Sequence, residues 1–304
     1  MYSYNLPVIL GATASGKTSV AVHWAHRNNG EIISADSRQV YREMTLGTGK
    51  DYADYMIDGE QIPCHCMDIV APGAQYNVYE YQKDFLHAFA DIRRRGKIPV
   101  LCGGSGLYIE AAVKGYRLIH TPVNEELRRE LARKDDRELQ YILSNLKVMH
   151  NQSDITTRKR TIRAIEIARY RQEHPEEINE YPEIRPLLIG IMYDRDTRRR
   201  RITERLKQRL DEGMLDEVRH LMNRGLTSEQ LEYYGLEYKY LTQHLTGQLT
   251  YGEMFDRLNT AIHQFAKRQM TWFRRMERNG DKIWWLDGDA SMERKMQRIA
   301  EIMR

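Results

Sequence analysis

The chain has 304 residues, of which 41% are hydrophobic and 30% are charged, a balance that suits a globular protein of one large or two modest domains and excludes a disordered chain. Without an apolar run of roughly 18 residues or a basic N-terminus followed by an apolar stretch, neither membrane association nor export is expected. The net charge is only +4, yet basic residues gather at 157–163, 195–201 and 267–275, so an acidic polymer is worth considering as a partner.

The first hundred residues alternate strand and helix signals. A strand is predicted over residues 6–10, followed by a glycine-rich loop and a helix over about 17–26. A second strand over 31–35, a helix over 79–95 and a strand over 98–102 follow. This β-α-β-α order predicts a parallel sheet covered by helices.

The character of the sequence changes near residue 117. Residues 122–180 predict polar, charged helices, and strand signal returns only at 186–192 and 282–286. We therefore predict an α/β fold with a P-loop NTPase-like parallel sheet flanked by helices. Its core would consist of residues 1–116 and 186–304, and a helical domain would be inserted at 117–185.

A long helix is predicted near the C-terminus, over residues 261–278. Four apolar side chains share one face at helical spacing, and we expect them to pack in the core: Ala261, Phe265, Trp272 and Met276. A polar and basic face, expected to meet solvent or a ligand, carries Gln264, Arg268, Thr271 and Arg275.

Three cysteines, Cys64, Cys66 and Cys102, are too few for a disulfide framework and suit the reducing cytoplasm. Cys64, His65 and Cys66 could suggest zinc, but two cysteines one residue apart without a second pair fit structural zinc spacing badly. An ordinary strand edge is the favoured interpretation of this cluster.

The strongest motif is a complete G-x-x-x-x-G-K-T phosphate loop between a strand and a helix. Its backbone amides would wrap a diphosphate, Lys17 would add a positive charge, and the Thr18 hydroxyl could bind Mg²⁺. The expected diphosphate-binding residues are Gly11, Ala12, Thr13, Ala14, Ser15, Gly16, Lys17 and Thr18.

Asp36 follows the second strand. Ligand crevices of open α/β sheets lie at the carboxyl ends of the strands, so this carboxylate is expected at the same edge as the loop. Taken alone, it is equally compatible with a helix N-cap or a second-shell partner of Mg²⁺.

Six segments in the same order resemble the tRNA dimethylallyltransferase family, in its bacterial form, over nearly the whole chain. They are GATASGKT at 11–18, DSRQVY at 36–41, LGTGKD at 46–51, GGSGLYIEAAVKG at 103–115, RTIRAIEIA at 160–168 and FAKRQMTWFR at 265–274. The resemblance implies an enzyme that prenylates the adenosine next to the anticodon. Its loop would hold the diphosphate of dimethylallyl diphosphate, and no ATP would be consumed.

The resemblance also implies catalytic roles. Asp36 would accept the proton of the adenine N6, and Lys17, Thr18 with Mg²⁺, and an arginine would stabilise the departing diphosphate. The family's arginine stands eight residues before the glycine of a G-x-x-x-E-V motif, which begins here at Gly213 and therefore selects Arg205. Without the resemblance, a surface salt bridge would be the favoured role of Arg205.

The implied partner is the anticodon stem-loop of a tRNA, whose target base must be flipped out of its stack. The inserted helices would grip the loop, the donor would enter from the opposite end of the channel, and a monomer is expected. The residues implied to contact tRNA are Asp36, Ser37, Arg38, Gln39, Ser105, Arg128, Lys159, Arg160, Thr161, Ile162, Arg163, Lys267, Arg268 and Gln269.

The chain departs from the family at two places. The family usually has IGTAKP where this chain has LGTGKD, so Asp51 replaces a proline and the loop after Thr48 is expected to be looser. Near Gly235 the family's Gly-Tyr-rich signature is altered, so no role is transferred to that segment.

Three alternatives remain open. A small-molecule P-loop kinase would use the same loop but has no need of the helical insertion or the AKRQMTWFR segment. A free-nucleotide prenyltransferase would differ only in its acceptor. An RNA-binding module with a vestigial loop would not require Lys17 and Thr18 to be intact.

Overall fold

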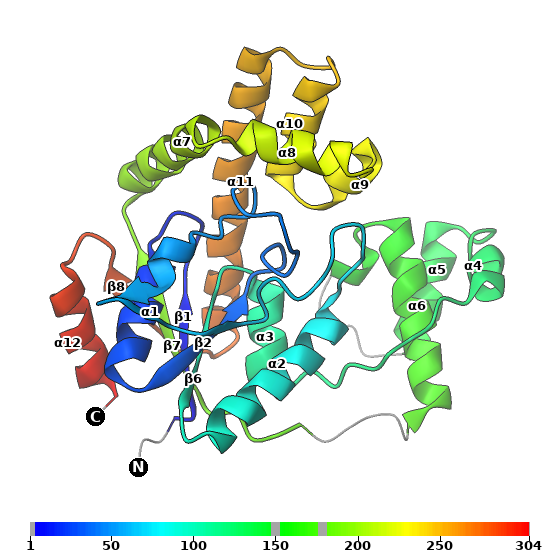
Figure 1. Ribbon diagram of the computed structural model, residues 1–304. Coiled ribbons are helices and arrows are strands. Elements are labelled where there is room, and N and C mark those ends of the chain that lie inside the picture. The colour runs from blue at the N-terminus through cyan, green and yellow to red at the C-terminus, as the bar shows by residue number, and fades with distance from the viewer. Residues whose placement is uncertain (1–3, 147–152, 176–180, 304) are drawn as a thin grey trace. The chain divides into compact units, whose positions relative to one another are not determined.

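The computed structural model describes residues 4–146, 153–175 and 181–303 and divides the chain into two compact units (Figure 1). The first unit combines Met1–Gly115 with Glu183–Arg304, and the second is Tyr116–Pro182. The helical insertion was expected over residues 117–185. It begins one residue earlier than expected, at Tyr116, and ends three residues earlier, at Pro182.

A six-stranded sheet forms the centre of the first unit, and every pairing within it is parallel. The predicted fold class is confirmed. Strands β1 and β2 are buried along their whole length, as expected of a parallel sheet covered on both faces. In spatial order the strands are β5 (Cys64–His65), β2 (Gly30–Ala35), β6 (Ile98–Gly103), β1 (Leu6–Leu10), β7 (Pro186–Met192) and β8 (Ile283–Asp287).

The strand order places three chain segments at one edge of the sheet. The phosphate loop follows β1, Asp36 follows β2, and Ser105 follows β6, which lies between them. Parallel strands end at a common edge, so these segments meet although the loop and Ser105 are far apart in sequence. The Cys64–His65 strand closes one side of the sheet, which confirms the strand edge predicted there.

Helices cover both faces of the sheet (Figure 1). On one side α1 (Lys17–Arg27) packs against α12 (Met292–Ile302), and on the other α2 (Val78–Arg94) packs against α3 (Gly106–Lys114). Asn77 and Glu80 form a capping box that fixes the start of α2. Between β2 and α2 lie a short 3-10 helix, η1 (Tyr52–Tyr55), and a hairpin of β3 (Met56–Ile57) and β4 (Glu60–Gln61).

Five helices follow β7 in the first unit before β8. They are α7 (Arg195–Asp211), α8 (Met214–Asn223), α9 (Ser228–Tyr233), α10 (Leu236–Leu245) and α11 (Tyr251–Arg278). Helix α11 begins ten residues before the predicted start, because Thr250 and Glu253 form a capping box there.

The predicted apolar face of α11 is wrong at Phe265, which is 39% exposed. The buried row is instead formed by Met254, Leu258, Ala261, Ile262, Ala266, Gln269, Met270, Phe273 and Met276. The predicted basic face is found: Gln264, Arg268, Thr271 and Arg275 line one shallow cavity of about 690 Å³.

The second unit is helical, as predicted, although residues 147–152 and 176–180 lie outside the described residues. It contains α4 (Glu125–Leu131), α5 (Asp136–Leu146), a 3-10 turn η2 (Ser153–Ile155) and α6 (Arg158–Glu173). Its own small core consists of Leu127, Leu131, Leu139, Leu143, Ala164 and Ile165.

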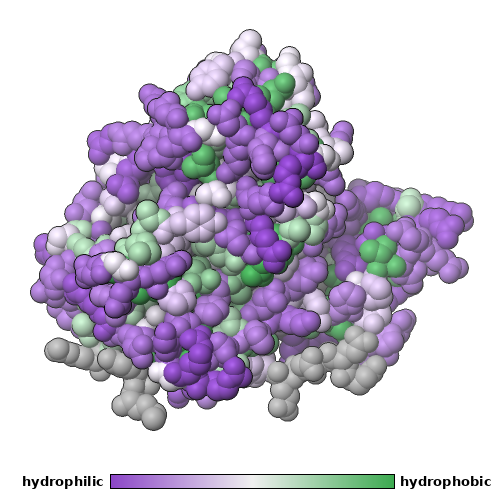
Figure 2. All heavy atoms as spheres, in the orientation of Figure 1, coloured by the Kyte–Doolittle hydropathy of each residue, from purple (hydrophilic) through white to green (hydrophobic). Residues whose placement is uncertain are grey.

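The surface is largely hydrophilic on the face drawn in Figure 2, with small scattered hydrophobic areas. Over the part of the chain that the structure describes, no helix combines the length and the apolar character needed to cross a membrane.

Candidate active site

The phosphate loop passes from β1 into α1 with two residues in the left-handed region, Ala14 (φ 60°) and Gly16 (φ 71°). Gly16 caps α1 without any side-chain hydrogen bond. The first amides of the helix are therefore free to face an anion. Burial lowers the pKa of Lys17, and Arg205 and Arg209 lower it further, whereas Cys102 and Asp36 raise it. Lys17 thus stands among the charged groups predicted to act with it.

Two helices that are remote in sequence clamp the loop. Gln269 of α11 accepts a hydrogen bond from the Thr13 amide (2.8 Å) and donates one to the Gly104 carbonyl (3.0 Å). From α7, the Arg201 Nε donates to the Ala14 carbonyl (3.1 Å). Both ends of the buried Gln269 amide are used inside the protein. We therefore correct its predicted tRNA contact: it positions the loop.

Asp36 lies at the end of β2 in a tight turn, where its Oδ1 accepts a hydrogen bond from the Arg38 amide (2.9 Å). The Ser105 hydroxyl accepts a hydrogen bond from the Ser37 amide (3.0 Å), which joins the ends of β2 and β6 beside the aspartate. Asp36 and Ser105 therefore belong to one local structure.

Two other residues predicted to line the tRNA side differ in their surroundings. Gln39 accepts a hydrogen bond from the Ser34 hydroxyl (3.0 Å) and donates one to the Gly49 carbonyl (3.0 Å), so its side chain holds a loop. Arg38 lies over the ring of Tyr233, with its guanidinium carbon 5.5 Å from the ring centroid. Tyr233 is 44% exposed, so the stacked pair remains accessible to a ligand.

Arg205 reaches the site from α7 and donates to Asp51 Oδ2 (2.6 Å). A second arginine, Arg209, donates to both oxygens of the same carboxylate (3.0 and 3.1 Å). Burial alone would raise the pKa of Asp51, but the two arginines outweigh it and lower the pKa. Sequence reasoning missed Arg209, although its i, i+4 spacing from Arg205 places both on one helix face.

The loop over residues 45–51 is anchored at many points, contrary to the looseness expected from its missing proline. Glu217 accepts hydrogen bonds from the amides of Thr45 (2.8 Å), Leu46 (2.7 Å) and Gly47 (3.0 Å). This glutamate is the acidic residue of the G-x-x-x-E-V motif, which the sequence analysis used only to find Arg205. Its carboxylate fixes the loop that carries Asp51.

Among residues 4–146, 153–175 and 181–303, no group of three or more His, Cys, Asp or Glu side chains is arranged to hold a metal ion. Mg²⁺ commonly uses one or two protein oxygens, waters and substrate phosphates, a pattern that Thr18 at the start of α1 fits. Burial raises the pKa of the nearby Cys102 thiol, which disfavours the thiolate form that a nucleophile would need.

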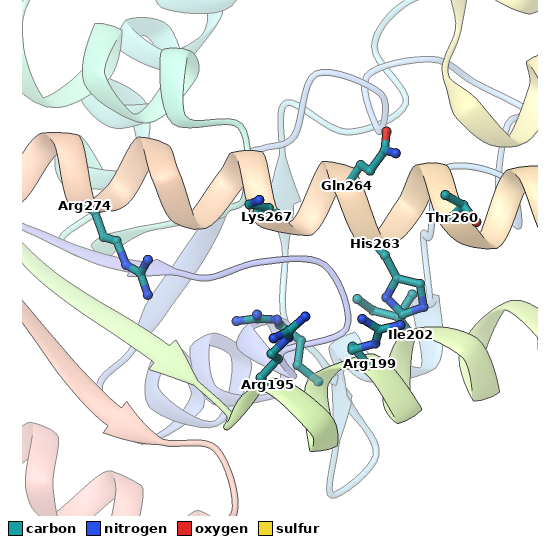
Figure 3. A pocket seen from close by; sticks show the side chains of 9 residues that line it. Arg195, Arg199, Ile202, Thr260, His263, Gln264, Lys267 and Arg274 are labelled. Carbon is teal, nitrogen blue, oxygen red and sulfur yellow. The ribbon is translucent and has the colours of Figure 1, made fainter.

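A basic cavity of about 590 Å³ lies between α7 and α11 (Figure 3). Its lining residues are Arg195, Arg198, Arg199 and Ile202 from α7, and Thr260, His263, Gln264, Lys267 and Arg274 from α11. No carboxylate among the described residues forms an ion pair with any of these four arginines or with Lys267. Burial and the neighbouring Arg274 and Arg195 lower the pKa of Arg198. Asp194 acts in the opposite direction on Arg198, but the lining of the cavity is mainly positive and therefore suits anions.

This cavity continues along α11 into the second one. The two share Gln264 and Lys267, and the second adds Arg268, Arg275 and Arg278. Lys267 and Arg268 are exposed on this surface, as expected of residues that contact phosphates. Of the three residues predicted from the K-R-Q segment, only Gln269 faces inward.

In the second unit, the predicted tRNA-contacting residues divide into two groups. Lys159 and Arg160 are exposed on the first turn of α6. By contrast, Arg128 and Arg163 both pair with the buried Glu166, and Arg163 also donates to the Thr121 carbonyl (2.8 Å).

The remaining two predicted residues of this segment, one buried and one partly buried, make contacts within the unit. Thr161 is buried and its hydroxyl donates to the Asp154 carbonyl (3.1 Å), and Ile162 packs on the core of the unit. Within the described part of this unit, Lys159 and Arg160 are therefore the members of the predicted set best placed to meet an RNA backbone.

Comparison with known proteins gives consistent matches over the whole length. A family model described as IPP transferase matches residues 39–276, and one described as isopentenyl transferase matches residues 4–62. A protein named tRNA dimethylallyltransferase 2 from Bacteroides fragilis is 56% identical over 304 residues, which cover 100% of this chain and 99% of that protein.

Solved structures agree. The full-length tRNA isopentenylpyrophosphate transferase of Bacillus halodurans is 32% identical, with a TM-score of 0.72 over 99% of this chain and 95% of that one. A eukaryotic dimethylallyltransferase acting on tRNA has a TM-score of 0.77 over 94% of this chain and 74% of its own. Its identity of 24% makes it evidence for the fold alone.

Proposed function

This chain belongs to the IPP transferase family, and from that premise we propose that it transfers a dimethylallyl group from dimethylallyl diphosphate to N6 of adenosine 37, next to the anticodon of tRNA. The products are N6-dimethylallyladenosine and diphosphate. The observation that carries the proposal is that a phosphate loop and a carboxylate, Asp36, share one edge of the sheet, where Asp36 acts electrostatically on Lys17.

The geometry gives each group a part in one displacement. The adenine N6 attacks the terminal allylic carbon, the carbon–oxygen bond breaks, and the diphosphate leaves with the electron pair. An exocyclic amine is a weak nucleophile, so Asp36 takes the N6 proton as the bond forms. Negative charge grows on the leaving oxygen, where Lys17, Arg205 and the loop amides stabilise it.

The clamps on the loop bear on this step. Donors stabilise a transition state most when they are already oriented and do not reorganise during the reaction. Gln269 and Arg201 fix the Thr13 and Ala14 peptides from outside, which supports a preorganised loop. When bound, Mg²⁺ supplies further charge to the diphosphate, and Thr18 is the residue that would hold it.

The acceptor is recognised by its backbone and by its flipped base. The exposed Lys267, Arg268, Lys159 and Arg160, together with the basic cavity between α7 and α11, provide unpaired positive charge for phosphates. The enzyme is proposed to act as a monomer in the cytoplasm, in keeping with its three free thiols.

The test is direct. Purified protein, Mg²⁺ and dimethylallyl diphosphate are incubated with an anticodon stem-loop that carries the target adenosine, and the nucleosides are analysed by mass spectrometry. We expect alkylated adenosine from the stem-loop, none from AMP, and no consumption of ATP. Alkylated AMP would favour a free-nucleotide prenyltransferase, and ATP consumption without alkylation would favour a kinase.

A further inference from the structure

The ion cluster at Asp51 combines one carboxylate with two arginines of unequal exposure. The Arg209 side chain is 10% exposed and contacts both carboxylate oxygens, whereas the Arg205 side chain is 30% exposed and contacts one. Arg209 therefore lies behind the carboxylate, and Arg205 lies toward the open side. The buried position of Arg209 suits an arginine that orients a neighbouring side chain, and the more exposed position of Arg205 suits one that binds a ligand.

Gly49 makes room for this arrangement. It has a φ of 76°, and a Cβ at this position would lie 2.8 Å from one guanidinium nitrogen of Arg209 and 2.9 Å from the other. Gln39 holds the Gly49 carbonyl (3.0 Å), so the backbone cannot easily move aside. Gly49 and Asp51 are both departures from the usual IGTAKP, and contact with Arg209 accounts for both.

The charges show what the cluster can contribute. Asp51 and Arg209 cancel each other, so together they add no net attraction for a diphosphate. Lys17 and Arg205 are then the cations left for the diphosphate, and the carboxyl groups of Asp54 and Glu237 also act on Arg205. The benefit of the pair is conformational, because an arginine side chain that is already held in place loses less rotamer entropy when it binds phosphate.

We propose that Asp51 and Arg209 are positioning residues for Arg205: Asp51 holds the guanidinium at the diphosphate site, and Arg209 takes up enough of the carboxylate's charge to leave Arg205 able to bind phosphate. This inference rests on the proposed function, since it assumes that a diphosphate binds beside Lys17. It assigns to Arg209 a role that differs from direct substrate contact.

The competing interpretation is a purely structural salt bridge between α7 and the 45–51 loop. Such a bridge would make all variants of the cluster less stable and lower their activity in parallel. A positioning role predicts instead that the two single variants have opposite effects on diphosphate affinity, and that the double variant recovers what one single variant loses.

The experiment measures binding of inorganic diphosphate with Mg²⁺ by calorimetry, without tRNA, and kcat and KM for the prenyl donor. In Arg209→Met the Asp51 carboxylate has Arg205 as its remaining arginine partner and holds it more tightly. We therefore expect the diphosphate Kd and the donor KM to rise about tenfold, as for the loss of one charged hydrogen bond. In Asp51→Asn the Kd should fall, because a negative charge beside the diphosphate is removed, while kcat also falls. In the double variant the Kd should return to within about threefold of the wild type, with kcat still low.

Arg219→Met is the matched control, because Arg219 pairs with Asp216 on the exposed surface of the next helix. It should leave every constant unchanged. Equal diphosphate affinity in Arg209→Met and wild type, or a double variant as weak as Arg209→Met, would overturn the inference while leaving the proposed function intact. A wild-type protein that binds no diphosphate would overturn both.

Discussion

Replacement of Asp36 by asparagine separates its chemistry from its structural contact. Asparagine keeps an Oδ1 that can accept the Arg38 amide bond of 2.9 Å, but it cannot take a proton. General-base catalysis contributes about 10²–10⁴ in rate, which corresponds to about 2.7–5.4 kcal/mol of barrier. We expect kcat for stem-loop prenylation to fall by that factor, while tRNA affinity and melting temperature stay near the wild-type values.

Asp36→Ala is the informative companion variant. It loses both the base and the turn, and a lost hydrogen bond of this kind costs about 1 kcal/mol of stability. Its kcat should match that of Asp36→Asn, whereas its melting temperature should be lower. Single-turnover assays with saturating donor report the chemical step. An Asp36→Asn enzyme with near-normal turnover would show that Asp36 is not the base, and the adenine proton would have to leave by another route.

Four further changes test the site and its support. Lys17→Ala should raise the donor KM and lower kcat, because the ammonium binds the diphosphate in both ground and transition states; a normal kcat would mean that the loop only tethers the donor. Charge reversal of Lys159 and Arg160 to Glu should weaken tRNA binding and reduce the slope of log K against log salt by roughly 1.5, and an unaltered slope would remove both from the interface. Gln269→Leu leaves two buried backbone groups unpaired and should cost about 1–3 kcal/mol of stability, with a raised donor KM in assays below the melting transition; an unchanged KM would argue against a clamp. Glu31 is buried among Arg95, Lys97 and His65. Its pKa is lowered, and the hydrogen bonds from Arg95 are the largest cause. The contribution of Glu31 to the free energy of unfolding should be complete above the ordinary glutamate pKa of about 4.3. It should be lost as pH falls below that value toward the lowered pKa of the folded state. Chemical denaturation should therefore find Glu31→Gln less stable by about 3 kcal/mol at pH 7, with a smaller difference at pH 3.

The elements that the sequence predicted well are those whose signal is local. Strand β1 and the phosphate loop are contiguous in sequence, and the glycine pattern of the loop motif predicts its backbone conformation. Helix α11 was found, but its apolar face was misplaced at Phe265, because the hydropathy of a residue does not say whether a neighbour exists to cover it. Arg160 and Arg163 are neighbours on one face of α6 at i, i+3 spacing. They differ because Arg163 pairs with the buried Glu166, a contact that the basic run itself does not reveal.

The residues that sequence reasoning missed depend on contacts across long stretches of chain. Asp51 and Arg209 are 158 residues apart, and Glu217 reaches loop amides about 170 residues away. Each looks like an ordinary surface charge in its own segment. A signal was nonetheless present, because the departure of LGTGKD from the family's usual loop marked the two positions that contact Arg209.

Helix α7 links the donor site to the basic cavity. Arg201, Arg205 and Arg209 follow one another at intervals of four residues and so lie on one face of the helix. The first contacts the phosphate loop, and the other two contact Asp51. A neighbouring face carries Arg195, Arg198 and Arg199 into the cavity shared with α11. One rigid element thus carries both the arginines at the loop and those that line the cavity, so a change that moves or unfolds α7 is expected to disturb both sites together.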